Sequence, residues 1–176
     1  RIFTQMKEDV SKTKMAVSLM LTLPRIPQIL YGTEILMEDS AKPGDHGLIR
    51  TDFPGGWKND KSNAFTGKNL QESQLEMQNY TRTLLNFRKN SKAIHEGETL
   101  HYAPKDGIYL LSRKYEDEIV IYIVNKNNKT VNLDTDRFTE IDANGKIFTD
   151  IHTDKTYKWG GKIQIKNNSS FILTNK

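Results

Sequence analysis

Charged, glycine and aromatic residues follow directly after a short apolar run near the N-terminus. The run, residues 26–31, ends at Gly32, and a polar loop comes next. A buried parallel strand has this pattern, and the carboxyl ends of such strands are where ligands bind in α/β proteins. Carboxylates there could accept hydrogen bonds, a guanidinium could donate them, and an aromatic ring offers a flat apolar face. The residues that could do this chemistry are Glu34, Asp45, His46, Arg50 and Trp57.

Two helices are predicted to flank the apolar run. Residues 12–23 carry apolar side chains at helical spacing, with Asp9 or Ser11 as the N-cap and a proline just beyond the end. Residues 73–89 form a second amphipathic pattern. Between them, residues 38–67 show no periodicity and many turn formers. A loop of that length is usually functional or disordered, and its aromatic residues favour a functional loop folded onto a surface.

From Thr99 onward, β-branched residues recur with a period of two. Asn-Asn, Asn-Gly and Gly-Gly pairs separate the apolar segments, so we expect a small antiparallel sandwich or barrel. The predicted strands are residues 108–111, 119–124, 130–133, 138–141, 147–151, 162–165 and 171–173. Residues 91–98 read as a polar joint, so the chain is expected to divide into residues 1–96 and 97–176.

Composition excludes several classes of function. The 176 residues are 36% hydrophobic and 27% charged, which is typical of a folded globular protein. The net charge of +4 comes from lysines and acids that alternate, with no basic stripe, so no nucleic-acid partner is expected. The absence of cysteine excludes disulfides and thiolate zinc sites. No acidic cluster has metal-ligand spacing and no run is long enough to cross a membrane, so we expect no metal, cofactor or membrane partner.

The apolar run and its neighbours also carry a family resemblance. The segment Pro27-Gln28-Ile29-Leu30-Tyr31-Gly32-Thr33-Glu34 resembles the eighth strand of the (β/α)8 barrel in α-amylase-family glycoside hydrolases, of the neopullulanase and cyclomaltodextrinase branch. The flanking helices resemble the seventh and eighth barrel helices. The β half resembles the C-terminal sandwich of these enzymes. The expected fold is therefore an α+β fragment, the last helix–strand–helix portion of the barrel followed by an antiparallel β-sandwich.

The resemblance implies that this chain is one part of a larger enzyme. These enzymes cleave α-glucans with retention, using carboxylates that lie upstream of the eighth strand. The chain is therefore expected to be an inactive C-terminal fragment of an enzyme that degrades starch, maltodextrin or cyclodextrin. The family implies a periplasmic or extracellular parent enzyme. Arg25 stands where the family usually has glycine, which predicts a somewhat different backbone path there.

Each site residue has two interpretations. By the resemblance, Asp45 and Arg50 are an Asp–Arg pair that holds sugar hydroxyls, although a mutual salt bridge is as plausible. Glu34 is a pocket carboxylate or, preferred two to one, a structural acid. His46 contacts substrate or is a surface histidine. Trp57 stacks on a sugar ring or, as we favour, anchors the loop.

The alternative function is a non-catalytic carbohydrate-binding β-sandwich. Its glucan patch would use Trp159 and Tyr157, although aromatic residues in hairpins more often pack across strands. In either case the strand at residues 26–31 lacks neighbours within the chain. We expect it to be covered by the missing half of the barrel, to pack on the sandwich, or to cause self-association.

Overall fold

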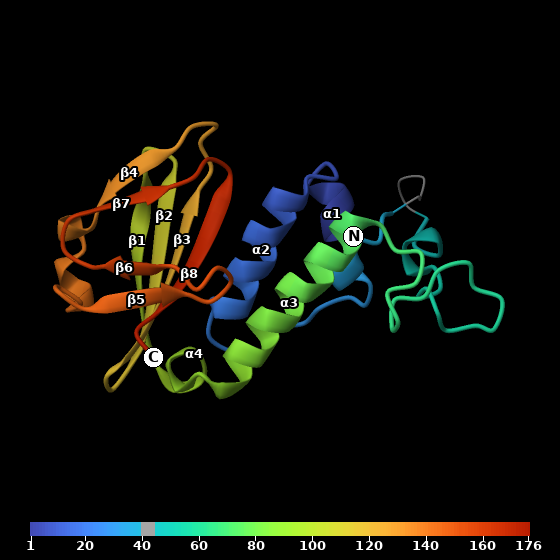
Figure 1. Cartoon of the computed structure of the whole chain (residues 1–176), viewed down its shortest axis with the longest axis horizontal. Coiled ribbons are helices and arrows are strands. Elements are labelled where there is room, and N and C mark those ends of the chain that lie inside the picture. The colour runs from blue at the N-terminus through green and yellow to red at the C-terminus, as the bar shows by residue number, and fades with distance from the viewer. Residues whose placement is uncertain (40–44) are drawn as a thin grey trace. The chain divides into compact units, whose positions relative to one another are not determined.

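The computed structural model describes residues 1–39 and 45–176 (Figure 1). The chain forms two compact units, and each is made of two segments. The first unit comprises Arg1–Lys14 and Gln28–Arg82. The second comprises Met15–Pro27 and Thr83–Lys176. Both long helices therefore contribute to both units, and the predicted division at residue 96 stays a prediction about the domains of the protein.

The two predicted helices are confirmed, with bounds that differ by one or two residues at each end. The four α-helices are α1 (Ile2–Gln5), α2 (Val10–Thr22), α3 (Glu72–Asn90) and α4 (Lys92–Glu96). Asp9 caps α2, because its Oδ1 accepts the backbone N–H of Lys12 at 3.0 Å. The short helix α4 replaces part of the predicted polar joint, and Ser91 Oγ caps it through the N–H of Ile94. No helix in the described ranges is long and apolar enough to span a membrane.

The predicted strand over residues 26–31 is wrong for this chain. Residues 26–30 have no regular secondary structure. A strand requires a partner for its backbone groups, and the described chain pairs none with this segment. The side chain of Ile26 is 96% exposed in consequence.

The backbone at Arg25 has a conformation that is unusual for a residue with a Cβ, and the expected difference in path from the family stays a prediction. The φ of Arg25 is +85°, in the left-handed region that favours glycine. The arginine therefore has a glycine-like conformation.

The C-terminal half is an antiparallel β domain, as predicted. Its larger sheet has six strands in the order β1-β2-β3-β8-β5-β6, and a two-stranded sheet pairs β4 with β7. The strands are β1 (Glu98–Lys105), β2 (Ile108–Tyr115), β3 (Glu118–Asn125), β4 (Val131–Asp134), β5 (Ile147–Asp150), β6 (Thr156–Lys158), β7 (Lys162–Ile165) and β8 (Ser169–Thr174).

Three details of the strand prediction are wrong. Residues 138–141 do not form a strand, because η3 (Thr135–Arg137) and η4 (Thr139–Ile141) are 3₁₀ helices. A 3₁₀ helix has three residues per turn, so Phe138 and Ile141 lie on the same face of this segment. Both side chains are buried. Strand β1 was missed because it is an exposed edge strand without alternating burial. It contains a proline and an irregular register, features that edge strands tolerate. Strand β6 was missed because it is only three residues long.

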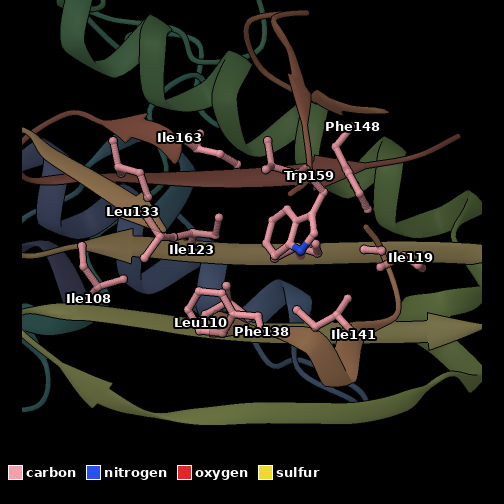
Figure 2. Packing of buried hydrophobic residues seen from close by; sticks show 14 residues of the cluster. Ile108, Leu110, Ile119, Ile123, Leu133, Phe138, Ile141, Phe148, Trp159 and Ile163 are labelled. Carbon is pink, nitrogen blue, oxygen red and sulfur yellow. The ribbon is translucent and has the colours of Figure 1, made fainter. Parts of the chain in front are cut away.

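The hydrophobic core of the β domain lies between the two sheets (Figure 2). Alternate residues of β2 and β3 face it, together with residues of β4, β7 and the 3₁₀ segment. Trp159 lies among these side chains, with its ring centroid 5.6 Å from that of Phe148 and 6.3 Å from that of Phe138. The core residues are Ile108, Leu110, Ile119, Ile121, Ile123, Leu133, Phe138, Ile141, Ala143, Phe148, Trp159, Ile163, Ile165 and Leu173.

The opposite face of the large sheet is also buried within the second unit. Tyr122 on β3 is 2% exposed, and its hydroxyl donates to the backbone carbonyl of Met15 in α2 at 2.9 Å. Arg113 on β2 is buried and donates to the carbonyl of Ile94 in α4 at 3.0 Å. Since β3 is buried along both faces, its sequence reads as a continuous apolar run rather than an alternating one.

Candidate functional site

Five predicted site residues lie in two segments of the first unit, and a tight turn sets the position of the first. Gly32 has φ +83°, and a Cβ on it would lie 2.2 Å from the Met37 sulfur. The conformation therefore favours glycine, and a larger residue would have to displace the Met37 side chain. Glu34 follows in the 3₁₀ helix η1 (Thr33–Ile35), where it is half-buried. Thr33 steadies the turn, since its hydroxyl donates to the Leu30 carbonyl at 2.7 Å.

Tyr31 connects the two segments that carry the predicted residues. Its hydroxyl donates to the backbone carbonyl of Thr51 at 2.9 Å. The Arg1 guanidinium lies 5.1 Å from the centroid of the Tyr31 ring and donates to the Tyr31 carbonyl at 2.6 Å. The segment that ends in Arg50 is thereby held beside the end of the apolar run. Sequence reasoning did not single out Tyr31, although a tyrosine at the end of an apolar run gives a weak signal for this role.

Asp45, His46 and Arg50 lie on a short exposed stretch around a second 3₁₀ helix, η2 (Leu48–Arg50). Asp45 Oδ1 accepts the backbone N–H of Gly47 at 3.1 Å. This bond orders the turn that leads into η2. All three polar side chains are accessible to a ligand. Residues 40–44 of the predicted loop lie outside the described part of the chain.

Trp57 does not serve as a packed anchor within this chain. Its side chain is 67% exposed, and the indole Nε1–H donates to Asp52 Oδ2 at 3.1 Å. Phe53 and Phe65 contact each other instead, with ring centroids 5.4 Å apart. The interpretation of Trp57 as an anchor that pins the loop to the barrel stays a prediction. One face of the indole is open to a ligand.

The loop that carries Trp57 is ordered by half-buried side-chain amides and by a turn-forming acid. Asp60 Oδ2 accepts the N–H groups of Gly55 and Trp57, at 2.7 and 3.0 Å. Gln74 and Gln78 on α3 bind the carbonyls of Ile35 and Ala64 at 3.1 and 2.9 Å. The loop is thus attached to a helix, which agrees with the expected functional loop. These ordering residues were missed because no local pattern marks a side chain that bonds to a distant backbone group.

The predicted site residues carry hydrogen-bonding groups and an aromatic face, which suit a hydroxyl-rich ligand. Glu34, Asp45 and Arg50 supply acceptors and a donor, and Trp57 supplies the flat apolar surface. The hydrogen bond from Tyr31 connects the segment that carries Glu34 to the segment that carries Arg50. The side chain of Trp57 is instead hydrogen-bonded to Asp52. Within residues 1–39 and 45–176, no three His, Cys, Asp or Glu side chains gather as a metal site.

The predicted aromatic patch on the β domain has a different outcome for each residue. Trp159 is 2% exposed and belongs to the core, so it offers no open ring for stacking. Tyr157 is half-buried and packs edge to face on Phe171 at 5.9 Å. The preferred interpretation, cross-strand packing, is confirmed.

Comparison with known proteins identifies the β domain most directly. Residues 99–174 match the family model described as the Cyclo-malto-dextrinase C-terminal domain. A maltogenic α-amylase of Bacillus acidopullulyticus is 28% identical over 135 residues, which are 74% of this chain and 20% of that protein. A cyclomaltodextrin glucanotransferase of Geobacillus stearothermophilus is 25% identical over 135 residues, 77% of this chain and 16% of that protein.

Solved structures extend the similarity to the helical part of the chain. The crystal structure of AmyP in complex with maltose aligns with a TM-score of 0.71 and 20% identity, covering 95% of this chain and 35% of AmyP. At that identity the likeness shows the fold alone. The chain spans a fifth or less of the length of the curated relatives that it matches.

Proposed function

We propose that the chain, whose residues 99–174 match the family model described as the Cyclo-malto-dextrinase C-terminal domain, is the C-terminal part of a retaining α-glucan hydrolase. The resemblance to the C-terminal part of α-amylase-family enzymes is confirmed by this match and by the two curated relatives. The match of the β domain is the observation that carries the proposal. The substrate would be starch, maltodextrin or cyclodextrin.

In this proposal, residues 1–96 are the last helix–strand–helix portion of a (β/α)8 barrel. The exposed, unpaired segment at residues 26–30 supports it, because a strand separated from its neighbours has this form. The left-handed backbone at Arg25 is further support, since the family usually has glycine at this position. The barrel half that precedes these residues in the family would pair with the segment.

The chain's own residues would form one wall of the glucan cleft. The carboxyl end of a barrel strand is where barrel enzymes bind substrate, and Glu34, Asp45, His46, Arg50 and Trp57 follow the proposed eighth strand. Asp45 would accept hydrogen bonds from sugar hydroxyls, and Arg50 would donate to sugar oxygens. Trp57 would stack on an apolar sugar face with its open ring. The nucleophile and the general acid would come from elsewhere in the barrel.

A hydrolysis assay tests this proposal. We expect the isolated chain to release no reducing sugar from maltoheptaose or β-cyclodextrin, whereas a protein extended by the upstream coding sequence hydrolyses at least one of them. Turnover by the isolated chain above a heat-killed control would disprove the absence of the catalytic acids. Failure of the extended, folded protein on both substrates would disprove the hydrolase assignment.

Substitutions in the extended protein test the binding wall. Asp45→Ala or Arg50→Ala should raise KM for maltooligosaccharides about tenfold or more, because each removes a charge-assisted hydrogen bond worth about 1.5–3 kcal/mol. Arg82→Ala, an exposed position on α3, is the control and should leave KM unchanged. Unchanged KM in both site variants would remove these residues from the site.

A further inference from the structure

A hollow of about 310 Å³ opens in the β domain, away from the predicted site residues in sequence. Its volume is at the lower end of the range of roughly 300–1,000 Å³ that is usual for small-molecule pockets. Two 3₁₀ helices, η3 and η4, form one wall, and the segments around residues 143–144 and 159–160 form the other. The lining residues are Thr135, Asp136, Phe138, Thr139, Asp142, Ala143, Asn144, Trp159 and Gly160.

Hydrogen bonds hold these walls in place. The Thr135 hydroxyl donates to the Gly161 carbonyl at 2.8 Å and accepts the Gly160 N–H at 3.0 Å. The Gly145 N–H donates to the Trp159 carbonyl at 2.8 Å, and the Trp159 N–H donates to the Lys146 carbonyl at 2.9 Å. Both walls are therefore connected before a ligand arrives, which reduces the ordering cost of binding.

The chemistry of the hollow changes from its inner end to its rim. Phe138, Ala143 and Trp159 are buried at the inner end, and Figure 2 shows Trp159 above Phe138 in the core. The rim is polar and exposed, with hydroxyl, carboxylate and amide groups from Thr139, Asp136, Asp142 and Asn144. Asp142 also lies 3.4 Å from the Lys114 amine, but its side chain is 85% exposed.

This distribution favours a neutral ligand that carries hydroxyl groups. The lining residues include no Lys, Arg or His, and the two rim carboxylates would repel a phosphate or a carboxylate. Carboxylate and amide oxygens accept hydrogen bonds from hydroxyls, and the aromatic inner end suits an apolar ring edge. The small volume fits a chain end better than the middle of a long polymer.

We propose that this hollow binds a terminal sugar residue of a short α-glucan, as a site separate from the loop of Glu34 and Trp57. The choice of an α-glucan rests on the proposed function. Unlike an open stacking patch, this site would use the polar rim for hydrogen bonds and the Trp159 edge only as its inner boundary. Its role would be to hold substrate on the β domain.

Two-dimensional NMR of the intact ¹⁵N-labelled chain tests the proposal, because its two tryptophans report on the two sites separately. The variant Trp57→Phe assigns the indole N–H signals. On titration with maltose we expect a saturable shift of the Trp159 signal. The β-linked isomer cellobiose should produce a weaker shift.

Paired variants locate the binding. Thr139→Tyr on the rim fills the mouth of the hollow and should weaken maltose binding about tenfold or more. Thr156→Tyr, at an exposed position on β6 outside the lining, should bind as the unsubstituted chain does. A spectrum of the free variants as well dispersed as that of the unsubstituted chain shows that they are folded.

The outcomes separate this proposal from the proposed function. No shift of Trp159, or an equal shift in Thr139→Tyr, would overturn the site even if the extended protein hydrolyses glucans. An equal response to cellobiose would overturn the α-glucan assignment. A Trp159 shift that Thr139→Tyr abolishes would support the site even if the extended protein proves inactive.

Discussion

At the residue scale, the backbone conformation of one residue and the burial of one acid affect stability in ways that composition does not reveal. Arg25 adopts a left-handed conformation that side chains with a Cβ rarely take, and Asp150 is a buried acid. Both residues are in the second unit. Each leads to a prediction that concerns one side chain and its immediate surroundings.

Replacing Arg25 with glycine should stabilise the protein. The side chain is exposed, so little packing is lost, and glycine removes the steric penalty at φ +85°. The expected gain is about 0.5–1 kcal/mol in the free energy of unfolding, measured with urea. Arg25→Ala retains a Cβ and should bring no such gain. Equal effects of the two substitutions would show that the conformation is not the cause.

Asp150 should make stability depend on pH in the direction opposite to an acid whose pKa is lowered by a salt bridge. Burial raises its pKa from 3.8, although the Thr153 hydroxyl donates to Oδ2 at 2.6 Å. Between 3.8 and the raised pKa, the native state binds more protons than the unfolded state, so this residue's contribution to stability falls as pH rises. Above the native-state pKa the full penalty is present.

The variant Asp150→Asn isolates this effect, because its side chain does not titrate. We expect the unfolding free energy of the unsubstituted chain, minus that of the variant, to decrease from pH 3.8 upward and then level off. Asp117→Asn, at an exposed position, is the control. A difference that increases over this range would contradict the prediction.

At the element scale, a buried arginine caps the C-terminal end of a helix. The Arg88 guanidinium, from α3, donates to the carbonyls of Leu21, Leu23 and Arg25 at 2.5, 3.2 and 2.6 Å. The last carbonyls of a helix have no partner within it. Arg88 therefore satisfies the end of α2 and the turn that follows, at a point where Pro24 prevents the helix from continuing.

Arg88→Met should destabilise the second unit by about 2–4 kcal/mol, because it leaves buried carbonyls without donors while preserving much of the side-chain volume. Arg82→Met on the same helix is exposed and is expected to change stability by less than about 0.5 kcal/mol. Urea unfolding followed by tryptophan fluorescence measures both, since Trp159 lies in the second unit's core. Equal losses in the two variants would show that the carbonyl contacts contribute nothing.

At the scale of the whole molecule, exposed apolar side chains indicate chain segments that need a cover. Ile26 is 96% exposed, and Leu30 and Tyr31 are 39% and 41% exposed. An unpaired extended segment also presents free backbone groups to another chain. In the proposed parent enzyme, the rest of the barrel would cover this segment.

Without that cover, the isolated chain is expected to self-associate in sedimentation velocity experiments. Ile26→Glu should weaken association about tenfold, because burial of one isoleucine contributes about 1.5–3 kcal/mol. Lys68→Gln, at an exposed position in the loop, lowers the net charge by the same one unit and is the control. A monodisperse monomer at high concentration would contradict this prediction.

Local sequence determined the features that depend on neighbouring residues. Asp9 ahead of an apolar period defined α2, and the β-branched runs between glycine and asparagine turns defined β2, β3 and β7. The loop of Asp45, Arg50 and Trp57 could also be identified as a candidate site, because its residue types and its place after an apolar run are local facts.

Only the tertiary structure decided features that depend on distant partners. Trp159 became a core residue because Phe138 and Phe148 surround it, and Trp57 stayed exposed because no described segment covers its ring. The apolar run at residues 26–31 has the composition of a strand, but pairing requires another chain segment, and no segment within residues 1–39 and 45–176 pairs with it. Side-chain pattern thus specifies what a segment can form, whereas the available partners decide what it does form.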